Sequence, residues 1–499
     1  MIRKTFLAAM AVAAALVAAP AQARWVEATT EHFTLYANLS DGEAAGYAMQ
    51  LERFDHLLRE MANLPNTPQS ASDRVIVYVV PLTMVQELAH STNIGGFYNS
   101  DVQSTLAVMP LSIPSDWDVG QFHVMFHEYT HHILLSSTEA SYPSWVQEGF
   151  AEFFGTVRFR PDGNLILGAP PQWRGYALRR QVQMTLEELL TLDGKKQDDR
   201  DMEDKYARGW LLTHYLLLGK KRPGQIDKYL NLVAAGVPSL EAGRQAFGEL
   251  SKLDGELNVY NRNGKFMTYV IPAKYAIAAP RVRPLGACEA SIMPTRIRSA
   301  VGVTEKTAPK LVPPARAAAK ECAGDAFVQR ALAEVEFDAK NNTEAMAAAD
   351  RALAADPGNV MAMVYKGRVF ARQSRWDEAR SWFIKANHAE PNYALPLVLY
   401  YDTYTRAGVA PTKAAVNALM RAIVLSPQDS SVRLRVAYEL IGEGDLALAR
   451  KVLAPAAFEV HGSGGNKALE VLRKIDAKAS PEAVLAQAKE AKWNEIGKE

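Results

Sequence analysis

The sequence predicts an α+β domain with a mixed sheet and a motif-bearing helix, followed by an all-α superhelical domain of repeated helix pairs. Three observations predict this division. In the first half, β-branched and aromatic runs alternate with amphipathic segments of helical period. A stretch rich in Pro, Arg and Ala follows near the middle of the chain. Beyond it, a short alanine-rich motif that ends in proline recurs at nearly constant spacing.

The length and charge of the chain limit what it can be. Its 499 residues are enough for two or three domains, each with its own core. Lys and Arg number 56 and Asp and Glu 55, which leaves a formal net charge of +1. A nucleic-acid partner would favour a strongly basic surface, so none is expected.

Residues 1–23 are predicted to be a removable signal peptide. Arg3 and Lys4 precede the apolar run Phe6–Ala19, and small residues at Ala21–Ala23 suit cleavage. The run is about 14 residues long, short of the roughly 20 that a membrane-spanning helix needs. We therefore expect a periplasmic or secreted protein without a stable membrane span.

Residues 24–275 are expected to form the α+β domain, with helices and strands placed by the spacing of apolar residues. The predicted strands are His32–Ala37, Arg74–Val80 and Ser104–Met109. The predicted helices are Glu43–Ala62, Gln121–Leu135, Met202–Leu218 and Pro223–Ala234. Asn258–Ile271 is predicted to be a small extended unit that closes this domain.

Residues 276–324 are expected to be a linker, because prolines are frequent there. Cys288 and Cys322 are the two cysteines of the chain. In an oxidising compartment they can form a disulfide, but two separate buried thiols are an equally open alternative.

Residues 325–455 are predicted to be helical repeats, and 456–499 a C-terminal helical tail. Pro357, Pro391 and Pro427 each end a similar motif, at spacings of 34 and 36 residues. This pattern resembles the tetratricopeptide repeat, whose period is about 34 residues. The resemblance implies a superhelix that binds a protein or peptide partner, whereas a generic helical bundle is the alternative.

The segment Phe122–Leu135 carries the strongest chemical signal. His127 and His131 are four residues apart, so on a helix both imidazoles project from one face and can bind one Zn²⁺. Glu128 lies beside the first histidine, where its carboxylate can take a proton from an attacking water.

A second helical segment, Trp145–Glu152, begins 14 residues after His131. Its Glu148 and Glu152 are four apart and share a face. One carboxylate can complete the metal ligands while the other holds a ligating histidine through its second nitrogen. Three protein ligands leave one position open, as in catalytic rather than structural zinc sites.

Together the two motifs resemble the gluzincins, the thermolysin and aminopeptidase N superfamily of zinc peptidases (peptidase MA), in which a glutamate on a second helix follows the histidine motif. The resemblance implies a zincin-like fold, with Glu148 as the third ligand and Glu152 as the carboxylate behind a histidine. The gap between His131 and Glu148 is slightly shorter than in the aminopeptidase N branch, so the resemblance is to the wider superfamily.

The segment Tyr206–Trp210 is similar to the aminopeptidase segment whose tyrosine stabilises the tetrahedral intermediate, although Ala207 replaces a glutamate there. The resemblance implies that Tyr206 donates a hydrogen bond to the oxyanion. Tyr215, in the same helical region, is an alternative, and a purely core role for Tyr206 is equally open.

These observations predict an exported zinc metallopeptidase with Glu128 as general base, a peptide or protein substrate paired with the strand at Thr105–Met109, and repeats that bind protein. A non-catalytic repeat scaffold with a vestigial peptidase domain is the alternative function. Hydrolysis of another amide or ester is a third possibility that the motifs leave open.

Overall fold

The computed structural model describes residues 24–66, 69–92, 94–113, 122–136, 142–179, 184–195, 197–272, 277–458, 465–493 and 496. The predicted signal peptide lies outside these residues. Among the described helices, none is long and apolar enough to cross a membrane.

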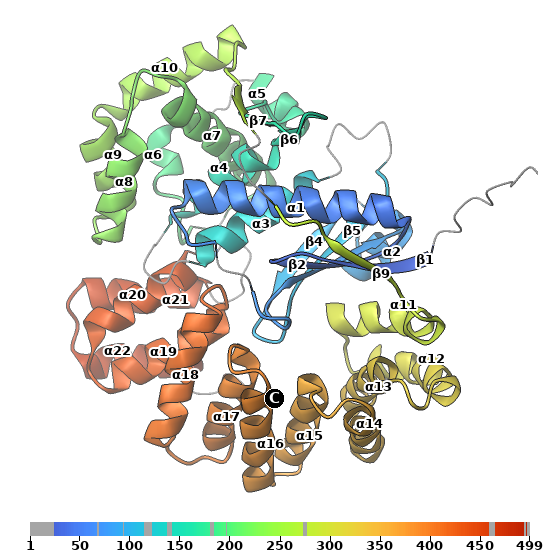
Figure 1. Ribbon diagram of the computed structural model, residues 1–499. Coiled ribbons are helices and arrows are strands. Elements are labelled where there is room, and N and C mark those ends of the chain that lie inside the picture. The colour runs from blue at the N-terminus through green and yellow to red at the C-terminus, as the bar shows by residue number, and fades with distance from the viewer. Residues whose placement is uncertain are drawn as a thin grey trace, which may run out of the picture.

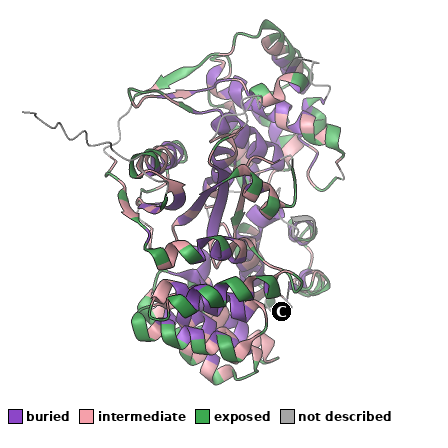
Figure 2. Cartoon of the chain, turned by 90° about the vertical axis from the view of Figure 1, so that its right-hand side faces the viewer, coloured by how far each residue is buried: buried purple, intermediate pink, exposed green. Residues whose placement is uncertain are grey.

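A mixed six-stranded sheet forms the centre of the N-terminal domain (Figure 1). Its order is β4 (Phe97–Ser100), β5 (Thr105–Pro110), β3 (Val75–Val80), β2 (Phe33–Leu39), β1 (Arg24–Thr29) and β9 (Arg281–Pro284). β2, β3 and β5 run parallel, and the other pairs are antiparallel. The apolar runs of β3 and β5 are buried in the middle, as Figure 2 shows.

Helices cover this sheet and extend the domain to one side (Figure 1). α1 lies across the sheet and begins with a capping box between Ser40 and Glu43. The bounds of the helices are α1 Asp41–Met61, α2 Leu82–Ala89, α3 His123–Leu135, α4 Ser144–Gly155, η1 Gln172–Arg174, α5 Gly175–Arg179, α6 Leu186–Leu189, α7 Asp199–Leu218, α8 Gln225–Ala234, α9 Ser239–Phe247 and α10 Leu250–Asn263.

The extended unit predicted at Asn258–Ile271 is largely wrong. α10 continues to Asn263 because Leu250, Leu253 and Leu257 bury one face of it, and Gly264 ends it with φ 60°. Only Tyr269–Ile271 is extended, as β8, and it joins β6 (Arg158–Phe159) and β7 (Leu165–Leu167) in a small second sheet.

The linker predicted at 276–324 is also wrong where this segment is described. β9 pairs with β1, and α11 (Ala287–Val301) and α12 (Ala308–Glu321) follow it. Alanines favour α12, and its Pro309 lies in the first turn, where no backbone N–H partner is lost. A disulfide between Cys288 and Cys322 joins the two helices.

The remaining helices form an arc below the sheet (Figure 1). They pair in succession as α13 (Ala326–Asp338) with α14 (Asn342–Ala355), α15 (Val360–Arg372) with α16 (Trp376–Ala389), α17 (Ala394–Arg406) with α18 (Lys413–Leu425), and α19 (Ser430–Gly442) with α20 (Leu446–Ala457). α21 (Gly465–Asp476) and α22 (Pro481–Glu490) close the arc. α14, α16 and α18 each end two residues before the repeated proline, which is disfavoured inside a helix.

Candidate metal site

The two motif histidines and Glu148 come together between α3 and α4. His127 Nε2 lies 3.3 Å from His131 Nε2 and 3.4 Å from Glu148 Oε2, and His131 Nε2 lies 3.6 Å from the same carboxylate oxygen. Ligands about 2.0–2.1 Å from a tetrahedral zinc are roughly 3.3–3.4 Å from one another. The three atoms therefore fit the ligand triangle of one zinc ion.

All three side chains are buried, so their charges are not screened by water. Glu148 is 1% exposed, and neither of its oxygens has a hydrogen-bond partner within the described part of the chain. Burial alone would raise the pKa of Glu148, but the two facing imidazoles lower it well below its ordinary value. Burial would lower the pKa of His127, yet Glu148, Glu152 and Glu128 raise it to about 9. The three carboxylates thus favour a positively charged group next to His127.

Glu152 lies near the second ring nitrogen of His127, Nδ1, which has no hydrogen-bond partner among the described residues. Its Oε1 is 3.8 Å from His127 Nδ1. Arg174 Nη2 donates to the same oxygen at 2.7 Å, and Trp173 Nε1 donates to Oε2 at 2.9 Å. Sequence reasoning missed both donors because η1, which carries them, is not part of either motif.

Two glycines allow the helices that carry the site to touch. A Cβ on Gly149 would lie 2.6 Å from the carbonyl oxygen of Gly209, and one on Gly209 would lie 3.1 Å from that of Trp145. α4 and α7 therefore cross at a glycine contact, which brings Glu148 close to the residues before Gly209 on α7. Lys205, which belongs to neither zinc-site motif, is buried with Nζ 3.9 Å from Glu148 Oε1.

The structure separates the two tyrosine candidates. The ring centroid of Tyr206 lies 6.1 Å from that of His127, and the guanidinium of Arg174 lies 4.4 Å above the Tyr206 ring. Tyr215 instead donates to Glu256 Oε2 at 2.9 Å, away from the metal ligands. Of the two, Tyr206 is therefore the one beside the site.

Glu128 is half-buried and lines a cavity of about 620 Å³ together with His131 and β4. The expected substrate strand requires a correction. β5, which corresponds to Thr105–Met109, is an inner strand with every residue buried, whereas β4 is the edge strand. Tyr98 on β4 is hydrogen-bonded to His132 Nδ1 at 2.7 Å, which ties this edge to α3.

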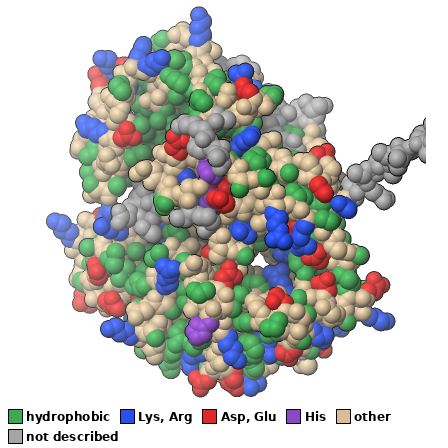
Figure 3. All heavy atoms as spheres, viewed as in Figure 1, with side chains coloured by type: hydrophobic (Ala, Val, Ile, Leu, Met, Phe, Trp, Pro, Cys, Tyr) green, Lys and Arg blue, Asp and Glu red, His purple; other side chains and the backbone are tan. Residues whose placement is uncertain are grey.

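The repeats hold the turn between β4 and β5. Tyr393 donates its hydroxyl proton to the carbonyl oxygen of Gln103 at 2.6 Å, and Arg368 donates to the side-chain oxygen of Gln103 at 2.7 Å. The space-filling view shows an opening between the N-terminal domain and the arc of repeats around this region (Figure 3). The turn between β4 and β5 therefore occupies part of the surface of the repeats that faces the sheet.

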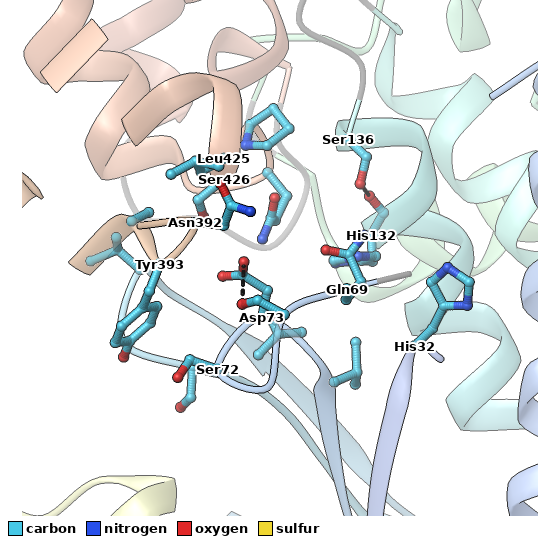
Figure 4. A pocket seen from close by; sticks show the side chains of 18 of the residues that line it. His32, Gln69, Ser72, Asp73, His132, Ser136, Asn392, Tyr393, Leu425 and Ser426 are labelled. Carbon is cyan, nitrogen blue, oxygen red and sulfur yellow. Dashed lines mark hydrogen bonds between the residues drawn. The ribbon is translucent and has the colours of Figure 1, made fainter. Parts of the chain in front are cut away.

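A second cavity of about 450 Å³ lies between the repeats and the N-terminal domain (Figure 4). Asp73, His132 and Tyr393 are among its lining residues. None of the predicted metal ligands, and neither Glu128 nor Tyr206, lines it, but it shares Asp101, His132 and Gln428 with the cavity beside Glu128.

Comparisons with known proteins find similarity only to solved structures. No protein family matches the sequence, and no curated protein matches it. The solved structure from a functional characterisation of PilF of Pseudomonas aeruginosa is similar with 16% identity and a TM-score of 0.33, over 41% of this chain and 90% of that chain. YrrB, a tetratricopeptide-repeat protein described with an unusual peptide-binding site, is similar with 21% identity and a TM-score of 0.27, over 36% of this chain and 91% of that chain.

Proposed function

We propose that the chain is a zinc-dependent peptidase that acts outside the cytoplasm. The observation that carries the proposal is the triangle of His127, His131 and Glu148, whose ligand atoms lie 3.3–3.6 Å apart in a buried pocket. Glu128 beside this triangle and the accessible edge strand β4 support peptide hydrolysis. The predicted signal peptide and the Cys288–Cys322 disulfide support an oxidising compartment.

In this function each side chain has a distinct role. His127, His131 and Glu148 would hold the zinc, which supplies Lewis-acid activation of the attacking water and of the scissile carbonyl when bound. Glu128 accepts a proton from the attacking water as the new carbon–oxygen bond forms and passes it to the leaving amine as the carbon–nitrogen bond breaks, so that Glu128 ends the cycle as a carboxylate. Tyr206 donates a hydrogen bond to the carbonyl oxygen as negative charge develops there. β4 binds the substrate backbone in an extended conformation.

The competing function is a non-catalytic repeat scaffold. Both solved structures reported above are tetratricopeptide-repeat proteins, which agrees with a binding role for the repeats. However, a vestigial site would not be expected to keep three buried ligand atoms at metal spacing together with the general base.

Cleavage of a mixed peptide library by the purified protein that begins at Arg24 tests the proposal. We expect turnover that a chelator stops and added zinc restores. A protein that binds zinc at about one ion per chain but cleaves no peptide or related amide would favour the scaffold function.

A further inference from the structure

The cavity beside Glu128 and His131 has walls from two distant parts of the chain. One wall is β4 and the residue after it, Asp101. The opposite wall is the beginning of α19, including its N-cap residue Asp429 and Ser430. The fourth helix pair of the repeats therefore forms part of the space in which a substrate side chain next to the scissile bond would lie.

Gln147 contributes a buried acceptor to this cavity. It is 1% exposed, and its Nε2 donates to the carbonyl oxygens of Tyr142 and Phe458 at 2.7 and 2.6 Å. Only the NH₂ end of an amide can donate to a carbonyl, so these two bonds fix the orientation of the side chain. Its Oε1 is left without a hydrogen-bond partner among the described residues. A buried acceptor without a donor is costly unless a ligand or a water molecule in the cavity supplies one.

The charged residues that line the cavity are all acidic. They are Asp101, Glu128 and Asp429, and the described lining contains no Lys or Arg. Asp429 is 3% exposed. Basic groups lie outside this lining: Arg368 acts on Asp101 from the repeats, and Lys205 Nζ is 3.9 Å from Glu148 Oε1. Within the described lining itself, no Lys or Arg side chain accompanies Asp101 and Asp429. Such a cavity favours a cationic group and disfavours an anionic one.

We propose that this cavity binds the side chain of a Lys or Arg residue of the substrate, with Gln147 Oε1, Asp101 and Asp429 as acceptors. The proposal rests on the proposed peptidase function and adds its specificity. It also gives the repeats a second role, because Asp429 belongs to them: they help to select the substrate side chain at the active site. An ammonium or guanidinium group supplies the donors that the cavity lacks.

The test measures binding rather than turnover. Short neutral peptides carry either Lys or its uncharged isostere norleucine at each position in turn, and their Kd values are measured with the zinc-loaded Glu128→Gln protein. We expect a Kd at least about tenfold lower for the Lys peptide at one position. In the same protein with Asp101→Asn and Asp429→Asn, the ratio of the two Kd values should fall towards one.

The Asn substitutions remove charge while keeping the capping oxygen. Oδ1 of Asp429 accepts from the backbone of Val432 at 2.7 Å, and Oδ1 of Asp101 accepts from that of Ser104 at 2.9 Å. Asn preserves both kinds of hydrogen bond. Asp445→Asn is the matched control, because it changes the cap of α20 outside the cavity and should leave the ratio unchanged.

The outcomes separate this inference from the function on which it rests. Equal affinity for the two peptides at every position, or a Lys preference that survives the double substitution, overturns the inference. Zinc-dependent cleavage without any preference for a basic residue would leave the peptidase function in place and remove only the specificity. Selective binding of Lys peptides without cleavage by the wild type would support the preference for a basic side chain and contradict the peptidase function.

Discussion

Two buried clusters of histidines and carboxylates lie close together in the N-terminal domain, and they differ in how their polar atoms are satisfied. We call one the metal cluster and the other the charge network. The metal cluster consists of His127, His131 and Glu148. The charge network consists of His32, Glu52, Asp55, Arg59 and Tyr129.

The two clusters contain similar residue types, but the distances between their polar atoms differ. In the charge network, His32 Nδ1 lies 2.6 Å from Glu52 Oε1, and Asp55 Oδ1 accepts from the Tyr129 hydroxyl at 2.6 Å. These are full hydrogen bonds, and they satisfy the buried charges within the protein. In the metal cluster the corresponding contacts are 3.3–3.6 Å, which is long for charge-assisted hydrogen bonds but matches ligands around a cation.

The largest effect is expected from Glu128→Gln. Loss of the general base should lower kcat by roughly 10²–10⁴-fold while the zinc content stays near one per chain. Steady-state cleavage assays and metal analysis measure the two quantities. Glu241→Gln, at an exposed position on α9, is the control and should change neither. Unchanged turnover in Glu128→Gln would remove Glu128 from the mechanism.

Alanine at one histidine of each cluster sharpens the comparison. His131→Ala should abolish stoichiometric zinc binding, because it removes a ligand. His32→Ala should keep zinc but lower the free energy of unfolding by about 3–5 kcal/mol, because it leaves Glu52 and Asp55 short of a buried partner. Metal analysis and denaturant unfolding distinguish the variants. Loss of zinc from His32→Ala alone would reverse our assignment of the two clusters.

Removal of one tyrosine hydroxyl near each cluster is expected to lower kcat in one case and the free energy of unfolding in the other. Tyr206→Phe should lower kcat by about 10²–10³-fold, as loss of an oxyanion donor does, with little change in stability. Tyr129→Phe should lower the free energy of unfolding by about 1.5–3 kcal/mol, because Asp55 loses a hydrogen bond at 2.6 Å. If Tyr206→Phe changed stability and left kcat unaltered, Tyr206 would be a packing residue.

Gly149→Ala tests the helix contact that positions Glu148. The new Cβ would lie 2.6 Å from the Gly209 carbonyl oxygen and 2.7 Å from Thr213 Oγ1, so α4 has to move away from α7. We expect a loss of about 1–3 kcal/mol in the free energy of unfolding and weaker zinc binding. Gly255→Ala in α10 meets nothing within 4 Å and should instead be stabilising. Equal behaviour of the two variants would contradict the proposed contact.

Local patterns in the sequence indicated the centre of the site. The four-residue spacings in α3 and α4 selected His127, His131, Glu148 and Glu152, because helical geometry places such residues on one face. Strands β2, β3 and β5 were also predicted, since their apolar runs are short and rich in β-branched residues.

Features that depend on contacts between distant segments could not be predicted. β9 pairs with β1 across more than half of the chain, partly through an ion pair of Arg283 with Glu27, and nothing near Arg283 in the sequence indicates this partner. Arg174 and Trp173 reach Glu152 from a short 3₁₀ helix that lies outside both motifs. The same applies to α19, which lines the cavity beside Glu128 only because the arc of repeats returns to the N-terminal domain.

The most direct test of the central claim is an anomalous-scattering map at the zinc edge from crystals of the zinc-loaded protein. We predict one peak, about 2.0–2.2 Å from His127 Nε2, His131 Nε2 and a carboxylate oxygen of Glu148. A peak at His32 and Glu52 of the charge network, or none in either cluster, would contradict the account.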